Sequence, residues 1–258
     1  SMNGSPRSDF CLDAYRALIG SLLQSGYNAR DYADVDADLR HVILRHDVDM
    51  CLDSATLLAQ VEAEMGVHSW YFVLMRSELY NTLAPASVEC LKTIVGLGHR
   101  IGVHVDAAQY GSDREALERG VAEECAIAES ILGQPMEMVS FHRPSQALLG
   151  DERAIAGRAH SYQPRYFSAL GYCSDSRGCW AHGHPLQHDA VRSGRALQLL
   201  THPIWWTGET RSDPVERLQA FVTDRLRRLH QTLARECSVH QVPDDSGVAP
   251  RRVAGEVD

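Results

Sequence analysis

The sequence predicts a single α/β domain in which a parallel sheet curls into a barrel or a partial barrel. Short apolar runs alternate with amphipathic stretches along most of the chain, and several of the runs end abruptly in polar residues. Strands that alternate with helices form right-handed βαβ units, and about six such units in roughly 200 residues favour a barrel. The chain has 258 residues, 44% hydrophobic and 23% charged, which is typical of a globular protein.

The first predicted element is a helix over 10–23, where apolar side chains recur at helical spacing and the pattern stops at Gly26. The apolar run 41–45 predicts a buried strand that delivers polar residues at its C-terminal end. An amphipathic helix is expected over 53–65. The next strand is expected over 69–74, because that stretch is rich in aromatic and β-branched residues.

The same alternation continues through the middle of the chain. A helix is expected over 86–97 and a strand over 100–105. The long amphipathic stretch 112–132 predicts a helix, because Gly133 stands where a helix C-terminus is expected. Another strand is expected over 136–141.

The last predicted elements are strands over 171–174 and 196–201 and a closing helix over 213–236. We expect one domain over residues 1–240, because no composition shift or internal repeat divides it. The tail over 241–258 contains proline, glycine and charges without periodicity, so we expect it to be disordered.

Composition excludes several classes of protein. The formal net charge of −9 argues against a nucleic-acid binder, which needs a basic face. No stretch approaches the roughly 20 apolar residues of a membrane span, and the first residues lack the apolar core of a signal peptide, so we expect a cytoplasmic protein. The seven cysteines include no C-x-x-C pair, which favours reduced thiols over a cysteine zinc site.

Side chains that suit metal binding and proton transfer follow four of the predicted strands. They are His46, Asp47, Asp49, His104, Asp106, His142, Arg143 and His202. In parallel α/β barrels the active site lies at the C-terminal ends of the strands. One such residue alone is more often a loop residue or a helix cap, whereas the same feature at four strand ends indicates a site.

Imidazole and carboxylate groups without cysteine favour one divalent cation, namely Zn²⁺ or a neighbouring first-row metal such as Co²⁺, Ni²⁺ or Mn²⁺. Asp47 and Asp49 are two residues apart, so on a regular strand they face the same side. One carboxylate can then bind the metal while the other handles protons.

These motifs resemble the polysaccharide deacetylase, or NodB-like, family, which is carbohydrate esterase family 4. The resemblance covers roughly residues 40–205, with the motifs in the family's order. It implies a distorted (β/α) barrel of about six or seven parallel strands. It also implies a hydrolase that removes an N-acetyl or other small acyl group from an amino sugar or related amine, with a water on the metal as nucleophile.

The first two motifs imply the metal ligands. RHDVD resembles a split version of the family's acidic pair, with Asp47 as the catalytic base and Asp49 as a ligand. His104 matches the first histidine ligand, but the second histidine, expected four residues later, is replaced by Ala108. His142 is the first choice for the substitute ligand and Asp106 the second, and loss of the metal is the third alternative.

The later motifs imply roles around the metal. Arg143, before Pro144, resembles the arginine that orients the catalytic base, and an arginine beside Asp47 would keep that carboxylate ionised. Asp175 resembles the acid that tunes the catalytic histidine, and Trp180 the aromatic residue that lines the pocket. His202 in LLTHP resembles the general acid that protonates the leaving amine.

Trp205 and Trp206 follow His202 directly. Indole rings at the rim of a site can stack on a sugar ring, and packing in the core is an equally good interpretation. The expected substrate is a small-molecule or lipid-linked amino sugar, such as a sugar nucleotide, rather than an assembled polymer.

Two other functions compete with deacetylation. Ala108 motivates a metal-free pseudoenzyme or carbohydrate-binding protein on the same barrel. A different metal-dependent hydrolase, such as a deformylase, would use the same Lewis acid.

Overall fold

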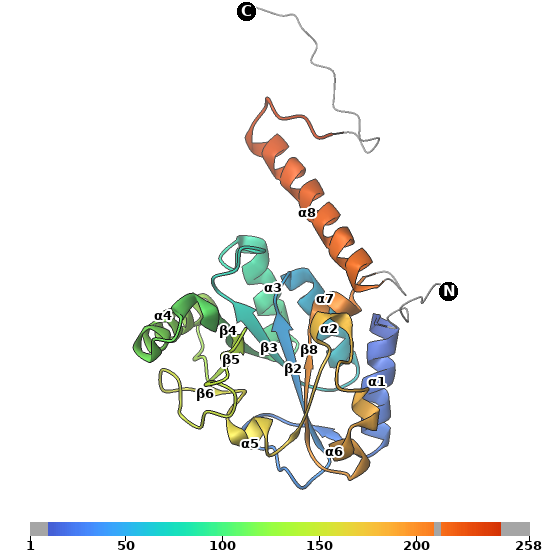
Figure 1. Ribbon diagram of the computed structural model, residues 1–258. Coiled ribbons are helices and arrows are strands. Elements are labelled where there is room, and N and C mark those ends of the chain that lie inside the picture. The colour runs from blue at the N-terminus through green and yellow to red at the C-terminus, as the bar shows by residue number, and fades with distance from the viewer. Residues whose placement is uncertain (1–9, 209–212, 244–258) are drawn as a thin grey trace, which may run out of the picture. The chain divides into compact units, whose positions relative to one another are not determined.

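The computed structural model describes residues 10–208 and 213–243 (Figure 1). The chain divides into two compact units, Ser1–Ser212 and Asp213–Asp258. The first unit contains the sheet and its helices, and the second contains helix α8 (Pro214–Glu236). From residue 244 onward, the tail expected to be disordered lies outside the described residues.

The sheet of the first unit is parallel throughout. Its strand order is β6-β5-β4-β3-β2-β8-β7, and the short β1 pairs with β2. The strands are β1 (Asn28–Ala29), β2 (His41–Val48), β3 (Trp70–Leu74), β4 (Arg100–Asp106), β5 (Met138–His142), β6 (Ala159–His160), β7 (Gly171–Ser174) and β8 (Leu197–Thr201). Within the described residues β6 and β7 do not pair with each other, so the curled sheet is an incomplete barrel.

Helices connect and cover the strands (Figure 1). The longer ones are α1 (Leu12–Gln24), α2 (Leu52–Glu64), α3 (Pro85–Gly96) and α4 (Arg114–Leu132). The short ones are α5 (Pro164–Phe167), α6 (Asp189–Arg192) and α7 (Pro203–Trp206), with 3₁₀ turns η1 (Ala107–Tyr110), η2 (Ser176–Gly178) and η3 (Pro185–Gln187). The predicted curled parallel sheet is confirmed. The two-residue strands β1 and β6 and the short helices were not predicted. None of the helices in the described part of the chain is long and apolar enough to cross a bilayer.

Strand β2 is buried along its whole length, and its two faces serve different purposes. Successive side chains of a strand point to opposite faces. Val42 and Leu44 pack with residues of α1 and α2, whereas Ile43 packs inside the curl with Phe72 and Met138. Arg45 and Asp47 share the inner face with Ile43, so the strand carries two charged groups into the interior.

The outer face of β2 is tied down by a buried glutamate. Glu62 of α2 is fully buried and accepts hydrogen bonds from the hydroxyls of Tyr15 (2.6 Å) and Tyr71 (2.7 Å). His46 lies 2.5 Å from Glu62 through Nε2 and 2.6 Å from the Thr201 hydroxyl through Nδ1. Burial raises the pKa of Glu62, but the charge and hydrogen bonds of its partners outweigh burial and lower the pKa to about 2. This network connects α1, α2, β3 and the neighbouring strands β2 and β8.

Gly102 of β4 tests how tightly the interior is packed. A Cβ at this position would lie 2.4 Å from Cε1 of Phe72 and 2.8 Å from the carbonyl oxygen of Met138. We therefore expect Gly102→Ala to destabilise the fold by about 2–3 kcal/mol. The free energy of unfolding, from urea denaturation, measures the effect.

Gly96→Ala is the matched control. A Cβ at Gly96, the last residue of α3, would meet nothing within 4 Å. This variant is expected to be unchanged or up to about 1 kcal/mol more stable, since alanine favours helix. Equal stability of Gly102→Ala and wild type would show that the interior can relax around the added methyl group.

Candidate active site

A cavity of about 330 Å³ lies where the inner faces of β2, β4, β5 and β8 end. Side chains from all four strand ends line it, together with aromatic and arginine side chains from β7, η2, α7 and the connecting segments. The lining includes Asp47, Asp49, His104, His142, Arg143, Tyr162, Tyr172, Arg177, His202 and Trp205. The carboxyl ends of parallel strands meet at one edge of the sheet, which explains why groups so distant in sequence share one cavity.

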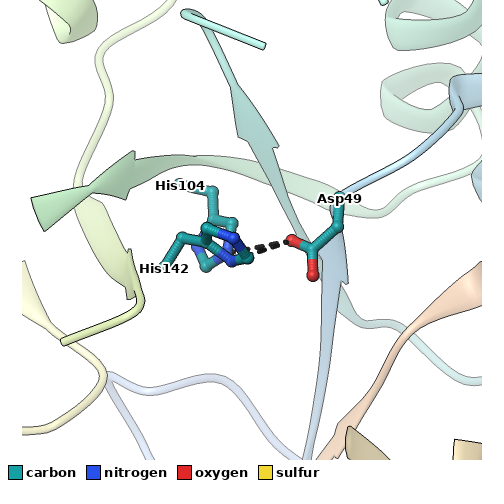
Figure 2. A group of neighbouring side chains, drawn as sticks. All are labelled: Asp49, His104 and His142. Carbon is teal, nitrogen blue, oxygen red and sulfur yellow. Dashed lines mark ion pairs between the residues drawn. The ribbon is translucent and has the colours of Figure 1, made fainter. Parts of the chain in front are cut away.

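Three of these residues form a candidate metal centre (Figure 2). Asp49, His104 and His142 each offer a ligand atom, and these atoms lie within 4.8 Å of one another. Oδ1 of Asp49 is 3.1 Å from Nε2 of His104 and 3.5 Å from Nδ1 of His142. The two imidazole rings reach toward the carboxylate from neighbouring strands (Figure 2).

The donor atoms are poorly satisfied by the protein. Oδ1 of Asp49 and Nε2 of His104 are buried and have no hydrogen-bond partner among the described residues, although they lie close together. Buried polar atoms without a partner are rare in folded proteins. Nδ1 of His104 is 2.6 Å from the Ser140 hydroxyl, which fixes the ring with Nε2 toward Asp49. One carboxylate and two imidazole donors fit a single divalent cation of the zinc type.

The other expected ligand positions are occupied differently. Ala108 lies in η1 and has no donor side chain. The carboxylate of Asp106 accepts the backbone N–H of Ala108 at 3.3 Å and forms an ion pair with Arg143. Asp106 is therefore engaged away from the group formed by Asp49, His104 and His142.

The arginine beside Asp47 is Arg45, which corrects the expectation for Arg143. Arg45 is fully buried and donates from Nε and Nη2 to the two carboxylate oxygens of Asp47, at 3.1 and 2.8 Å. Because both oxygens already accept this guanidinium, the position beside Asp47 is filled. Arg143 instead pairs with Asp106, and its side chain is 63% exposed.

Arg45 also has contacts that hold it in place. Its Cζ lies 4.9 Å from the centre of the Tyr162 ring, and Nη1 lies 3.5 Å from Oε1 of Gln198. Burial alone raises the pKa of Asp47, but the charges of Arg45 and His104 outweigh it and lower the pKa below its usual value. The sequence interpretation missed this residue because Arg45 ends an apolar run. Its place two residues before Asp47, on the same strand face, is the signal that could have identified it.

His202 and Asp175 form a second charged pair at the cavity. Nδ1 of His202 is 2.7 Å from Oδ1 of Asp175, and the His202 backbone N–H donates to both oxygens of that carboxylate at 3.1 Å. Trp206 Nε1 donates to Oδ2 of Asp175 at 2.7 Å. Nε2 of His202 lies 3.6 Å from Oδ2 of Asp49. The structure thus brings together two residues that the motifs associated with each other.

The tryptophans separate into two groups. Trp205 lines the cavity, whereas Trp206 is 2% exposed and packs against Phe10, as does Trp180. Of the two interpretations left open for Trp206, the structure favours core packing, and Trp180, expected to line the pocket, also packs against Phe10 outside the cavity lining. Neighbouring residues of a helical turn point about 100° apart, and here the turn directs Trp205 toward the cavity and Trp206 into the core.

Two arginines at the cavity have unusual backbone conformations. Arg143 has a φ of 50° and Arg177 a φ of 61°. Non-glycine residues rarely adopt this left-handed region, and those that do cluster at functional sites. Both arginines belong to the cavity lining, and Arg143 is paired there with Asp106.

Solved structures resemble the chain at low sequence identity. A CE4 family pseudoenzyme from Bacillus anthracis is 12% identical over 74% of this chain and 61% of its own, with a TM-score of 0.41. A family 4 carbohydrate esterase from Bacillus anthracis is 16% identical over 82% of this chain and 86% of its own, with a TM-score of 0.42. Both of these proteins are named as members of carbohydrate esterase family 4.

A third solved structure is the catalytic domain of a peptidoglycan N-acetylglucosamine deacetylase from Eubacterium rectale. It is 17% identical over 76% of this chain and 89% of its own, with a TM-score of 0.41. Carbohydrate esterase family 4 is the family that the sequence motifs resemble. No protein-family profile matches the sequence, and no curated protein matches it.

The His202–Asp175 pair predicts a pH dependence of the metal-free protein. Burial lowers the pKa of His202, but the hydrogen bond and charge of Asp175, with the charges of Asp49 and Asp47, raise it to about 9. Protonated His202 then stabilises the fold fully below a pH of about 6.5, and this contribution is lost as the pH rises through about 9.

An NMR titration of the histidine ring protons in chelator-treated protein measures this pKa. In Asp175→Asn the pKa of His202 is expected to fall toward its ordinary value, because the neutral amide removes the main favourable charge. Histidine signals remote from the cavity serve as the internal control. An unchanged pKa in the variant would show that Asp175 does not set the charge of His202.

Proposed function

We propose that this chain is a metal-dependent hydrolase that removes an N-acetyl or other small acyl group from an amino sugar or related amine. One observation carries the proposal. A single cavity combines a buried carboxylate held by an arginine, a histidine held by a carboxylate, and an Asp/His/His group adjacent to both. A base, an acid and a Lewis acid are the three components that metal-assisted hydrolysis of an amide uses.

Asp49, His104 and His142 would hold one divalent cation, most naturally Zn²⁺, with Co²⁺, Ni²⁺ and Mn²⁺ as alternatives. When bound, such an ion polarises the acyl carbonyl and lowers the pKa of a water molecule to about 7. Ser140 supports this arrangement, because its hydroxyl orients His104 and lies 3.4 Å from Oδ1 of Asp47.

Asp47 is proposed as the base that takes the proton from the attacking water. Its Oδ2 lies 3.7 Å from Nε2 of His104, next to the candidate metal centre. Arg45 keeps the carboxylate ionised and fixes its direction by a two-pronged contact. The base is therefore deprotonated and oriented before substrate arrives.

His202 is proposed as the acid that protonates the leaving nitrogen. Its pKa of about 9 keeps the ring protonated at neutral pH. Asp175 holds Nδ1, which leaves Nε2 as the atom that faces the cavity. The acid and the base approach the same centre from β8 and β2, so one group can supply a proton while the other takes one.

The mouth of the cavity supports a small, negatively charged amino sugar as substrate. Arg177 would attract a phosphate or carboxylate group, and Trp205 offers an apolar ring surface. A sugar nucleotide or a lipid-linked amino sugar combines these features. A cavity of about 330 Å³ suits a single acylated sugar ring.

Metal binding tests the ligand assignment. Titration calorimetry of Zn²⁺ into chelator-treated protein is expected to show about one site per chain. Asp49→Ala, His104→Ala and His142→Ala should each weaken binding by about a hundredfold or more, since each removes a direct ligand. Asp106→Asn is the control and should retain binding, because that carboxylate pairs with Arg143. Loss of Zn²⁺ binding in Asp106→Asn would instead identify Asp106 as a metal ligand.

Turnover tests the proposed reaction. Metal-loaded protein is expected to release acetate from N-acetylated hexosamines or from their nucleoside diphosphate derivatives. Asp47→Asn and His202→Gln should lower kcat by about 10²–10⁴-fold, because each removes a proton-transfer group, while Zn²⁺ remains bound. Arg177→Gln, the matched control at the cavity mouth, should mainly raise KM for charged substrates.

Two outcomes would redirect the proposal. Release of formate rather than acetate would indicate a deformylase on the same site. A wild-type protein that binds these sugars but takes up no metal would be a carbohydrate-binding pseudoenzyme.

A further inference from the structure

Helix α8 is the main element described in the second compact unit, and its N-terminus is capped by side chains. It has 23 residues, which corresponds to a length of about 35 Å. The Asp213 side chain accepts the backbone N–H of Glu216 at 2.8 Å, and the Glu216 side chain accepts that of Asp213 at 3.0 Å. This reciprocal capping box satisfies backbone donors at the N-terminus and favours a defined helix.

One face of α8 is apolar and exposed. Six large apolar side chains, between 36% and 63% exposed, follow one another at steps of three or four residues: Val215, Leu218, Val222, Leu226, Leu229 and Leu233. This spacing puts them on one side of the helix. A continuous apolar stripe of this kind is typical of an interaction surface, whereas single exposed leucines are not.

The stripe is almost symmetric about Asp224, the midpoint between Val215 and Leu233. Val222 and Leu226 lie two residues on either side of it, and Val215 and Leu233 lie nine residues on either side. Leu218 and Leu229, six residues before and five after, complete the pattern within one residue. A second α8 running in the opposite direction would therefore present apolar side chains at matching heights. Asp224 is half a turn away from the stripe and would face solvent.

The charges of α8 favour the same orientation. The segment 213–224 has three acidic side chains and one basic side chain. The segment 225–236 has four arginines and one glutamate. An antiparallel pair sets the acidic half of each helix beside the basic half of the other and opposes the helix dipoles, whereas a parallel pair sets like charges together.

We propose that α8 pairs antiparallel with α8 of a second copy of this chain, through the stripe from Val215 to Leu233, about a two-fold axis near Asp224. An isologous contact of this kind closes on itself and produces a dimer rather than a filament. The proposal is independent of the catalytic assignment, because every residue it uses lies in the second unit.

Sedimentation equilibrium of the full chain tests the dimer. Wild type is expected at twice the chain mass of 28.6 kDa at micromolar concentrations. Leu226→Glu with Leu229→Glu should raise the dimer dissociation constant by about a hundredfold or more, since it places charges in the stripe. Gln231→Glu, on the opposite face and also exposed, adds the same kind of charge and should leave the dimer intact.

A monomeric wild type would overturn the proposal, and so would a dimer that the leucine variants leave unchanged. Helicity by circular dichroism checks that the variants fold. Loss of the dimer in the Gln231→Glu control as well would assign the effect to charge in general and overturn the specific face.

Disulfide trapping tests the antiparallel orientation. The exposed native cysteines, Cys179 and Cys237, are first replaced by serine. Val215 and Leu233 of one helix are about 27 Å apart, too far for a disulfide within the chain. Val215→Cys with Leu233→Cys should therefore cross-link two chains on oxidation, whereas Val215→Cys alone should not. Efficient cross-linking of the single variant would indicate a parallel pair and overturn the proposed arrangement.

Discussion

The buried ion pair between Arg45 and Asp47 is the constraint on which the rest of the first unit depends. Two charged side chains lie on the inner face of a strand where a barrel would otherwise place apolar residues. Removing one member of such a pair leaves an uncompensated buried charge, at a cost of about 3–5 kcal/mol. The surrounding strands must therefore supply polar partners and ring faces, and Gln198, Tyr162 and Phe72 do so. The interior is thus shaped around a fixed carboxylate.

One face of β2 carries a residue of the candidate site, and the other face carries a contact that holds the strand in the sheet. The inner face carries Asp47, and the outer face carries His46, which binds Glu62 and Thr201. Thr201 directly precedes His202 on β8. The same buried contact that holds β2 beside β8 therefore sets the relative positions of the proposed base and acid. A site built on paired strands needs little adjustment when substrate binds.

Much of the first unit could be predicted from local patterns in the sequence. Apolar runs that end in polar residues identified the main strands. The family resemblance implied Asp49 and His104 as ligands and made His142 the first choice for the third, and the structure brings these three side chains together. The sequence suggested that Arg143 contacts Asp47, whereas it contacts Asp106. Which of these two carboxylates it meets is decided by the tertiary structure and leaves no local pattern in the sequence. Arg45 had already filled the first position.

Other features depend on contacts that no local pattern reports. Glu62 resembles an ordinary polar residue of an amphipathic helix, yet it is fully buried. The two neighbouring tryptophans differ only in the direction that helix α7 gives each of them. The short β6 pairs with the free edge of β5, and β1 pairs with the first two residues of β2, before the pairing of β2 with β3 begins. Strands of two residues carry no periodicity of their own.

Gly102 and Phe72 lie against each other in the interior and share one packing space. The glycine has no Cβ, and the space that a Cβ would need is occupied by the edge of the phenylalanine ring. That ring lies 5.8 Å from the guanidinium carbon of Arg45. Positions 72 and 102 should therefore vary together in sequences with this barrel, a larger residue at one accompanying a smaller residue at the other. A substitution at 102, which does not itself line the cavity, would shift the ring beside Arg45 and so alter the direction of the Asp47 carboxylate without touching it.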